Sequence, residues 1–430
     1  MTNEDDSAPQ LPWAERAWLT SLESPYYNES HRKLQAYARK YISQNILPHN
    51  LKWEQDGDCP DAAKADFVNS GLPFANIPAQ YRPRGFATVA GIPADEFDVF
   101  HFMVLSDEGA RIEGGVGIAL AGAYAIGTPP ILNHGTEEQR RRWLPGLFTR
   151  ETSFCLGITE PSGGSDVGNI LTRAVKTEDG SHYVVTGTKK WITGAQWATH
   201  MTTAVRTGGP GIRGISLLVV PLRSEGVEIE KIQNSGQNAG GASWVRMRNV
   251  RVPVGNLLGQ ENAGFKYIMT NFNKERFLMA IVCNRKARTC LSTALQYAHT
   301  RETFGKPLVH HQIIRHKIIT LAREVESHWA WLEQIAYHIQ IHGWQSDDVA
   351  GRIALAKVAG GRMLELAARE AQQVMGGVAY QRNGPGGGGR IEQITRDLRM
   401  MVVGGGSEEI LGDLAFRQDT KAAQRRPSKL

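Results

Sequence analysis

Residues 154–167 read Phe-Cys-Leu-Gly-Ile-Thr-Glu-Pro-Ser-Gly-Gly-Ser-Asp-Val. The first half is apolar up to Ile158, and we expect it to form a strand that ends at Thr159. In the second half, Gly163 and Gly164 allow the backbone to approach a bound phosphate closely, because they carry no side chain. Alone, a turn of glycine and serine is equally typical of an ordinary surface loop. The complete run is far more specific.

The chain around this run alternates with a period of two. Between about Ser153 and Gly259, short apolar runs are separated by turn residues such as Asp179-Gly180. No helical segments alternate with these runs, which argues against a parallel nucleotide-binding sheet and predicts a small antiparallel barrel or sandwich. The expected strands include residues 183–186, 200–205, 215–220 and 243–252.

Helical periodicity dominates on both sides of this segment. Residues 30–146 are helical in rhythm and are divided by prolines, whereas residues 264–418 form longer helical stretches with a glycine-rich break at 384–389. The long stretches, 267–301, 312–341 and 349–376, suit a bundle of antiparallel helices. We therefore predict an α+β protein with an N-terminal helical domain (1–152), a middle β domain (153–260), a C-terminal four-helix bundle (261–418) and a disordered tail (419–430).

Residues 157–166 closely resemble the flavin signature of the acyl-CoA dehydrogenase family, which runs small-aliphatic-Ser/Thr-Glu-x-x-small-Gly-Ser/Thr-Asp. The resemblance implies that this segment binds FAD, with Thr159 and nearby backbone N–H groups at the isoalloxazine ring. It also implies the family fold, an acyl-CoA substrate and a homo-oligomer, either a dimer or a tetramer. The other FAD-binding residues that it implies in this segment are Leu156, Ile158, Gly164 and Ser165, and Ser165 is also expected to contact substrate.

Three further motifs extend the resemblance from about residue 18 to residue 418. Residues 190–193 (Lys-Trp-Ile-Thr) are similar to a family strand whose tryptophan covers the flavin edge. Residues 301–306, followed by His311-Gln312, and residues 373–377 (Gln-Val-Met-Gly-Gly) are similar to elements that contact FAD of a neighbouring subunit. An arginine suits that role because its planar fork can hold a pyrophosphate. The cofactor-binding residues implied are Trp191, Ile192, Thr193, Arg301, Thr303, Phe304, Gln312, Gln373, Val374, Gly376, Gly377, Ser407 and Glu409.

The catalytic base is expected at Glu275. Desaturation of a thioester needs a base for the α proton, and the family uses a buried glutamate with a raised pKa. In the commonest subgroup this glutamate lies near the C-terminus, where this chain has Gly405. The isovaleryl-CoA and long-chain members carry it earlier, within a Glu-Arg pair, which here is Glu275-Arg276. A solvated surface charge is the alternative interpretation of Glu275, and Glu408 and Glu409 are rival carboxylates. Asn273, Arg276 and Gly405 are expected at the substrate site.

Composition and charge narrow the remaining function classes. The formal net charge is +6, of which the last twelve residues supply half, and no basic stretch has interleaved aromatic residues, so nucleic-acid binding is not expected. Four scattered cysteines favour a reducing compartment. Residues 114–133 are uncharged but rich in Gly and Ala and interrupted by prolines, which predicts a buried core helix and no membrane association. Adjacent His310 and His311 cannot share a helical face, so we expect no metal site.

The chain ends in Ser428-Lys429-Leu430, a tripeptide that the peroxisomal import receptor reads. It predicts a eukaryotic, fungal-type peroxisomal member of the family. The electron acceptor stays open between an electron-transferring flavoprotein and oxygen, with a slight preference for oxygen or an unidentified acceptor. We prefer a short, branched or specialised acyl-CoA to a bulk fatty acid, and primary and secondary metabolism both stay open. Two alternatives are a flavin oxidase that acts without CoA, such as a nitroalkane oxidase, and an inactive flavin-binding scaffold.

Overall fold

The computed structural model describes residues 11–425. By internal contacts the chain divides into two compact units, a sheet unit (residues 53–97 and 115–275) and a helical unit (residues 11–52, 98–114 and 276–425). The predicted order of a helical, a β and a second helical segment along the chain is confirmed. The compact units nevertheless cut across these segments, because parts of the first helical segment belong to each unit.

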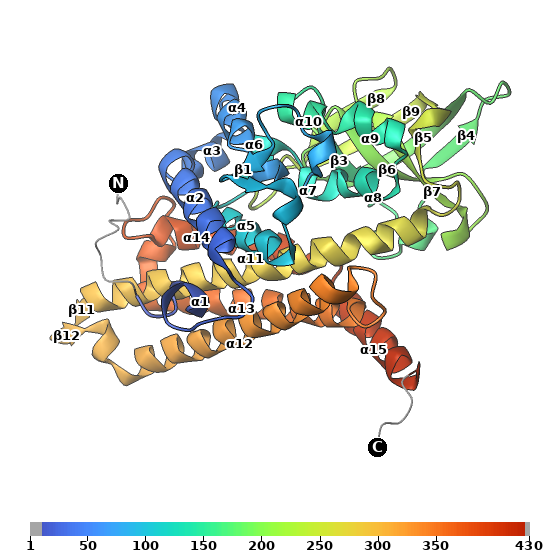
Figure 1. The fold of residues 1–430 in the computed structure, drawn as a ribbon. Coiled ribbons are helices and arrows are strands. Elements are labelled where there is room, and N and C mark those ends of the chain that lie inside the picture. Colours follow the sequence, from blue (N-terminus) through green and yellow to red (C-terminus); the bar gives the residue numbers. More distant parts are fainter. Residues whose placement is uncertain (1–10, 426–430) are drawn as a thin grey trace. The chain divides into compact units, whose positions relative to one another are not determined.

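The sheet unit contains one eight-stranded sheet (Figure 1). Its strands follow the order β10-β7-β6-β4-β5-β9-β8, and β3 pairs with β6. The bounds are β3 Phe154–Gly157, β4 Arg173–Lys176, β5 His182–Ile192, β6 His200–Arg206, β7 Ile215–Pro221, β8 Val227–Lys231, β9 Ser243–Pro253 and β10 Leu257–Leu258. A separate short hairpin is formed by β1 Thr88–Val89 and β2 Ile92–Pro93.

Burial explains why these runs form strands. The first six residues of β7 are all buried, as expected of a strand covered on both faces, whereas β9 alternates buried and more exposed positions over most of its length. Two apolar cores flank the sheet. Most pairings are antiparallel, as predicted, but β3 runs parallel to β6 and β4 meets β6 in parallel at one position. This differs from the expected purely antiparallel sheet because β3 enters from the preceding helical segment, not through a hairpin turn.

The short helices of the sheet unit correct one prediction. Residues 114–133 form three short helices instead of one buried helix, because Gly122 adopts a φ of +74° and Pro129 and Pro130 begin a new helix. These helices are α6 Val116–Ala121, α7 Tyr124–Gly127 and α8 Pro129–His134, followed by α9 Glu137–Trp143 and α10 Gly146–Thr149; α4 covers Asp61–Asn69. Among residues 11–425, no helix is long and apolar enough to span a membrane.

The helical unit is built around four long helices that share one apolar core (Figure 1). They are α11 Gly264–Thr300, α12 Gln312–His342, α13 Ala350–Met375 and α14 Gly388–Val403. The bounds of the first three agree closely with the predicted stretches, whereas no bounds were predicted for α14. The unit also contains α1 Ala17–Thr20, α2 Glu29–Asn45, α5 Val99–Gly109 and the hairpin of β11 Glu302–Thr303 and β12 Lys306–Pro307. Along the chain, α11 and α3 (Asn50–Asp56) pass from one unit to the other.

The C-terminal helix corrects the predicted disordered tail. Helix α15 runs from Glu408 to Arg425, so residues 419–425 are helical. Asp419 pairs with Arg352 at 3.5 Å and Arg425 pairs with Asp347 at 2.6 Å, which ties the end of α15 to neighbouring elements. Sequence alone could not show these partners. The terminal tripeptide, residues 428–430, lies outside the described residues.

Candidate functional site

The predicted flavin segment follows the end of β3. After Gly157, the chain continues through Ile158 and Thr159 into a tight turn that two backbone hydrogen bonds of 3.1 Å close between Glu160 and Gly163. Residues 164–166, which come next, are exposed. The strand end and turn predicted here are therefore present.

This turn leaves backbone donors available. Among residues 11–425, the backbone N–H groups of Thr159, Gly164 and Ser165 donate to no protein acceptor. The absence of side chains at Gly163 and Gly164 allows close approach of a ligand to the backbone. A set of free N–H groups on an exposed turn suits phosphate and flavin carbonyl oxygens, so the residues present fit FAD.

The second motif meets the first directly. The Lys190 backbone N–H donates to the Thr159 carbonyl oxygen at 2.9 Å, which places the end of β5 beside the flavin segment. Trp191 has a φ of +65°, next to a register shift in the pairing of β5 with β9, and its side chain is half exposed. A positive φ is strained for tryptophan, and such strain is concentrated at functional positions. The Lys190 ammonium lies between the Trp191 and Trp244 rings, 4.8 and 4.5 Å from their centroids. Ile192 is buried and Thr193 is half-buried.

A buried ion pair supports both motifs. Lys189 Nζ donates to Glu160 Oε1 at 2.7 Å and to the Ile158 carbonyl oxygen at 3.0 Å. Burial lowers the pKa of Lys189 to about 8, and Glu160 partly offsets this effect. Burial would raise the pKa of Glu160, but Lys189 and backbone hydrogen bonds outweigh it and hold the pKa below its ordinary value. Both groups are thus charged at neutral pH. No functional role was expected for this pair, although Glu160 lies inside the first motif and Lys189 directly precedes the second.

The remaining residues expected to bind FAD, including those for FAD of a neighbouring subunit, lie on the helical unit. Thr303 and Ser407 are half-buried, Val374 is buried and the others are exposed, and Phe304 has 96% of its surface accessible. The exposed ones are Arg301, Phe304, Gln312, Gln373, Gly376, Gly377 and Glu409. They occupy the β11–β12 hairpin, the start of α12, the end of α13 and the start of α15, where a second chain or a ligand has access to them.

Gly405 lies in a tightly held loop between α14 and α15. It adopts a φ of +66°, and a Cβ added there would lie 2.8 Å from Met279 Sδ. Arg276 Nε donates to the Gly405 carbonyl oxygen at 2.9 Å, and Lys357 donates to the carbonyl oxygens of Val402 and Gly406. A glutamate at this position would therefore adopt a costly backbone conformation, and the Met279 side chain would have to shift to admit it.

Glu275 lies within α11, directly before Arg276. Its side chain is half-buried, and Oε2 is shielded from solvent, unlike that of a freely solvated helix charge. Asn273 is also half-buried and Arg276 is buried. Of the rival carboxylates, Glu408 accepts a hydrogen bond from Arg362 Nε at 2.9 Å and Glu409 is exposed. Glu275 is the carboxylate best suited to act as a shielded base.

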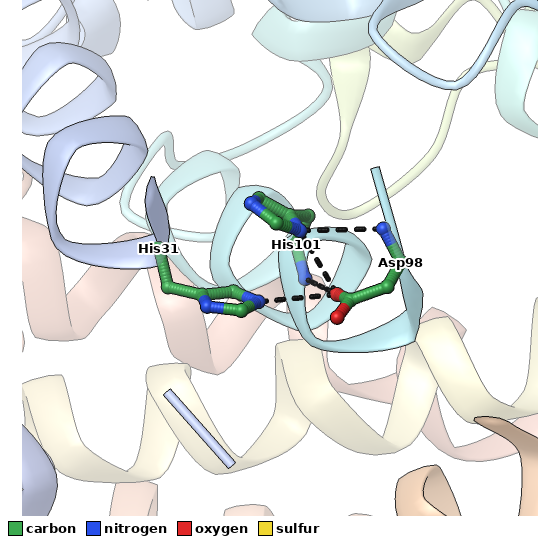
Figure 2. Close-up of side chains that lie close together, drawn as sticks. All are labelled: His31, Asp98 and His101. Atoms are coloured by element: carbon green, nitrogen blue, oxygen red, sulfur yellow. Dashed lines mark hydrogen bonds and ion pairs between the residues drawn. The ribbon is translucent and has the colours of Figure 1, made fainter. Parts of the chain in front are cut away.

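One group of three potential metal ligands occurs within residues 11–425: His31, Asp98 and His101 (Figure 2). Both histidines cap helices, because their Nδ1 atoms accept the backbone N–H of Asn28 at 3.1 Å and of Asp98 at 3.2 Å. Their rings are stacked with centroids 3.8 Å apart. Two ligands of one metal direct in-plane lone pairs at a common point, which stacked rings do not. We assign a capping role to this group.

Comparison with known proteins gives a consistent result. Three family models match consecutive parts of the chain: acyl-CoA dehydrogenase, N-terminal domain (residues 28–151), middle domain (155–250) and C-terminal domain (262–418). The chain is 42% identical to an acyl-CoA dehydrogenase, AFT10-1, from Alternaria alternata, over 96% of this chain and 97% of that one. It is 40% identical to an acyl-CoA dehydrogenase, apdG, from Emericella nidulans, over 98% of each chain. A solved probable acyl-CoA dehydrogenase from Mycobacterium abscessus superposes with a TM-score of 0.81 at 30% identity, covering 92% of this chain and all of that one.

Proposed function

The chain belongs to the acyl-CoA dehydrogenase family, and we propose that it desaturates an acyl-CoA thioester between its α and β carbons, with Glu275 as the base. It is an FAD-dependent oxidoreductase that acts on CH–CH groups. The exposed turn with its free N–H groups at Thr159, Gly164 and Ser165 supports FAD as the cofactor.

The chemistry divides between cofactor and protein. Bound FAD supplies the acceptor for the hydride that leaves the β carbon. Glu275 accepts the α proton at its carboxylate, and shielding of Oε2 from water keeps that group from being fully solvated. Residues 158–165 and Trp191 would hold the flavin on the sheet unit. Arg301, Gln312 and Gln373 would hold FAD of a neighbouring subunit through their exposed polar groups.

The observation that carries the base assignment is the contrast between positions 405 and 275. At 405 there is a glycine in a left-handed conformation that packs against Met279, and no carboxylate. At 275 a carboxylate with one shielded oxygen stands on α11. This contrast supports the subgroup that includes isovaleryl-CoA and long-chain enzymes, in which the base lies on the earlier helix.

Anaerobic mixing of the purified holoenzyme with a panel of acyl-CoA thioesters tests the reaction. We expect at least one short, branched or specialised thioester to bleach the flavin absorbance near 450 nm, and the thioester that does so identifies the acyl group. Admission of air then distinguishes oxygen from a flavoprotein as acceptor, because only an oxidase reoxidises quickly and forms peroxide. Reduction by a nitroalkane without CoA, or no reduction by any thioester, would contradict the proposal and favour a CoA-independent oxidase or an inactive scaffold.

Assembly and location complete the proposal. The high exposure of Phe304 and of neighbouring polar residues on the helical unit supports a homo-oligomer, a dimer or a tetramer, that shares its FAD sites.

The terminal Ser428-Lys429-Leu430 supports import into peroxisomes. We expect a fluorescent protein fused in front of the chain to enter peroxisomes, and deletion of residues 428–430 to leave it in the cytosol. An unchanged distribution after the deletion would argue against this address.

A further inference from the structure

The Lys189–Glu160 pair joins three parts of the sheet unit at the flavin segment. Lys189 belongs to β5, and its ammonium bonds to the Ile158 carbonyl oxygen at 3.0 Å and to Glu160 Oε1 at 2.7 Å. The carboxylate of Glu160 also accepts the backbone N–H of Leu171 at 2.6 Å and of Thr172 at 3.0 Å. One buried pair therefore fixes β5, the strand end at Ile158 and the chain leading into β4.

We propose that Lys189 and Glu160 are positioning residues for the flavin, which set the orientation of the free N–H groups at Thr159, Gly164 and Ser165. The inference rests on the proposed function and adds two residues to those already expected to hold FAD. Thr159 lies between the two residues that Lys189 contacts, Ile158 and Glu160, and its own carbonyl oxygen is held by the Lys190 N–H. The turn that carries Gly164 begins at Glu160. Rotation of either anchor would turn the N–H groups away from a ligand.

A contribution to stability alone does not explain why a buried ion pair occupies this position. Removing two charges from water is costly, and buried ion pairs can often be replaced by apolar residues without loss of stability. What an apolar pair could not supply is the set of directed hydrogen bonds to one carbonyl oxygen and two backbone N–H groups. Because Glu160 balances the charge of Lys189, the pair adds no net charge to this turn. The argument for a role in flavin binding therefore rests on the geometry of these hydrogen bonds.

Variants of the holoenzyme separate positioning from simple structural support. Lys189→Met removes both the charge and the donor, whereas Lys189→Met/Glu160→Gln also removes the carboxylate charge that would otherwise be left buried. We expect the FAD dissociation rate, followed by the rise in flavin fluorescence on dilution, to increase about tenfold or more in both variants. The double variant is expected to recover most of the unfolding temperature lost in the single one. It is not expected to recover FAD retention or the wild-type flavin midpoint potential.

Lys176→Met is the matched control, since Lys176 and Glu261 form a pair of the same 2.7 Å length in which both side chains are partly accessible. It should retain FAD as the wild type does. If the double variant regains wild-type FAD retention and midpoint potential, the pair acts only through charge balance and the inference is wrong. If Lys189→Met does not fold, the same measurements on Glu160→Gln decide the question, with wild-type values again counting against it. A wild type without FAD would reject the proposed function itself, whereas a wild type with FAD and unaffected variants would reject this inference alone.

Discussion

Replacement of Glu275 by Gln is expected to lower the rate of flavin reduction by the preferred acyl-CoA by about 10³- to 10⁴-fold, with FAD still bound. The amide occupies nearly the same volume but cannot accept the α proton, and general-base catalysis by a placed side chain contributes about 10²- to 10⁴-fold. We place the effect in the upper part of this range because the half-buried side chain gives water little access with which to replace the base. Anaerobic stopped-flow absorbance measures the reduction rate, and the visible spectrum reports FAD content.

Glu408→Gln is the matched control. Glu408 is also a helical carboxylate, at the first residue of α15, but it pairs with Arg362 near the surface. Its replacement should therefore leave the reduction rate within about twofold of the wild type. If the flavin reduction rate fell strongly in Glu408→Gln and only slightly in Glu275→Gln, the base would lie in the C-terminal region and not at Glu275.

A substitution in the loop at Gly405 provides a second test of the base assignment. Addition of Gly405→Glu to Glu275→Gln should not restore reduction, although it returns a glutamate to the place that the commonest family members use. The backbone at φ +66° is costly for any residue with a side chain, and Met279 Sδ stands 2.8 Å from the new Cβ. Gly405→Ala in the wild-type background measures the cost of the backbone conformation and of the Cβ contact together, without a carboxylate. Recovery of the rate in the Glu275→Gln/Gly405→Glu variant would show that this loop can still hold a working base.

Local patterns predicted most of the secondary structure. Short runs bounded by turn residues predicted β6 and β7 to within a residue, although both strands are buried along most of their length and do not alternate. Helical periodicity predicted α12 and α13, because each of these helices repeats its apolar residues along one buried face. The glycines and prolines of residues 114–133 were visible as well. Their effect was underestimated, since Gly122 takes a left-handed conformation that ends α6.

Features that depend on distant partners were not predictable from the sequence. The helical end of α15 is held by Asp347 and Arg352, which belong to other elements. The partner of Lys189 lies 29 residues away along the chain, and only the fold shows that the two charges are buried together. The motif residues Thr159 and Trp191 could be identified because the resemblance identified their neighbours too. Glu160 belongs to the same signature, but its pairing with Lys189 cannot be seen there.

The charge network around Glu108 was likewise not predictable from the sequence. Its disruption is expected to have the largest effect on stability. Glu108, on α5, is completely buried and accepts hydrogen bonds from Arg16 at 2.9 Å, Arg39 at 2.7 and 2.8 Å, Arg111 at 3.0 Å and Gln35 at 3.1 Å. It thereby ties the N-terminal segment, α2 and α5 together. Burial would raise the pKa of Glu108, but the arginines, Arg111 foremost, outweigh it and hold the pKa well below its ordinary value.

Glu108→Gln is therefore expected to lower the free energy of unfolding by about 3–5 kcal/mol, because three arginines lose a shared buried counter-charge. Guanidinium unfolding followed by circular dichroism measures the change. Glu365→Gln, which removes a more exposed partner of Arg399, is the control and should change stability by no more than about 1 kcal/mol.

A group whose pKa is depressed on folding contributes stability above its unfolded pKa and loses it as the pH falls towards the folded value. The gap between wild type and Glu108→Gln should thus be full at pH 7 and should narrow below the ordinary glutamate pKa of 4.5. A gap that stays constant down to pH 3 would mean that the loss comes from packing and not from the missing charge.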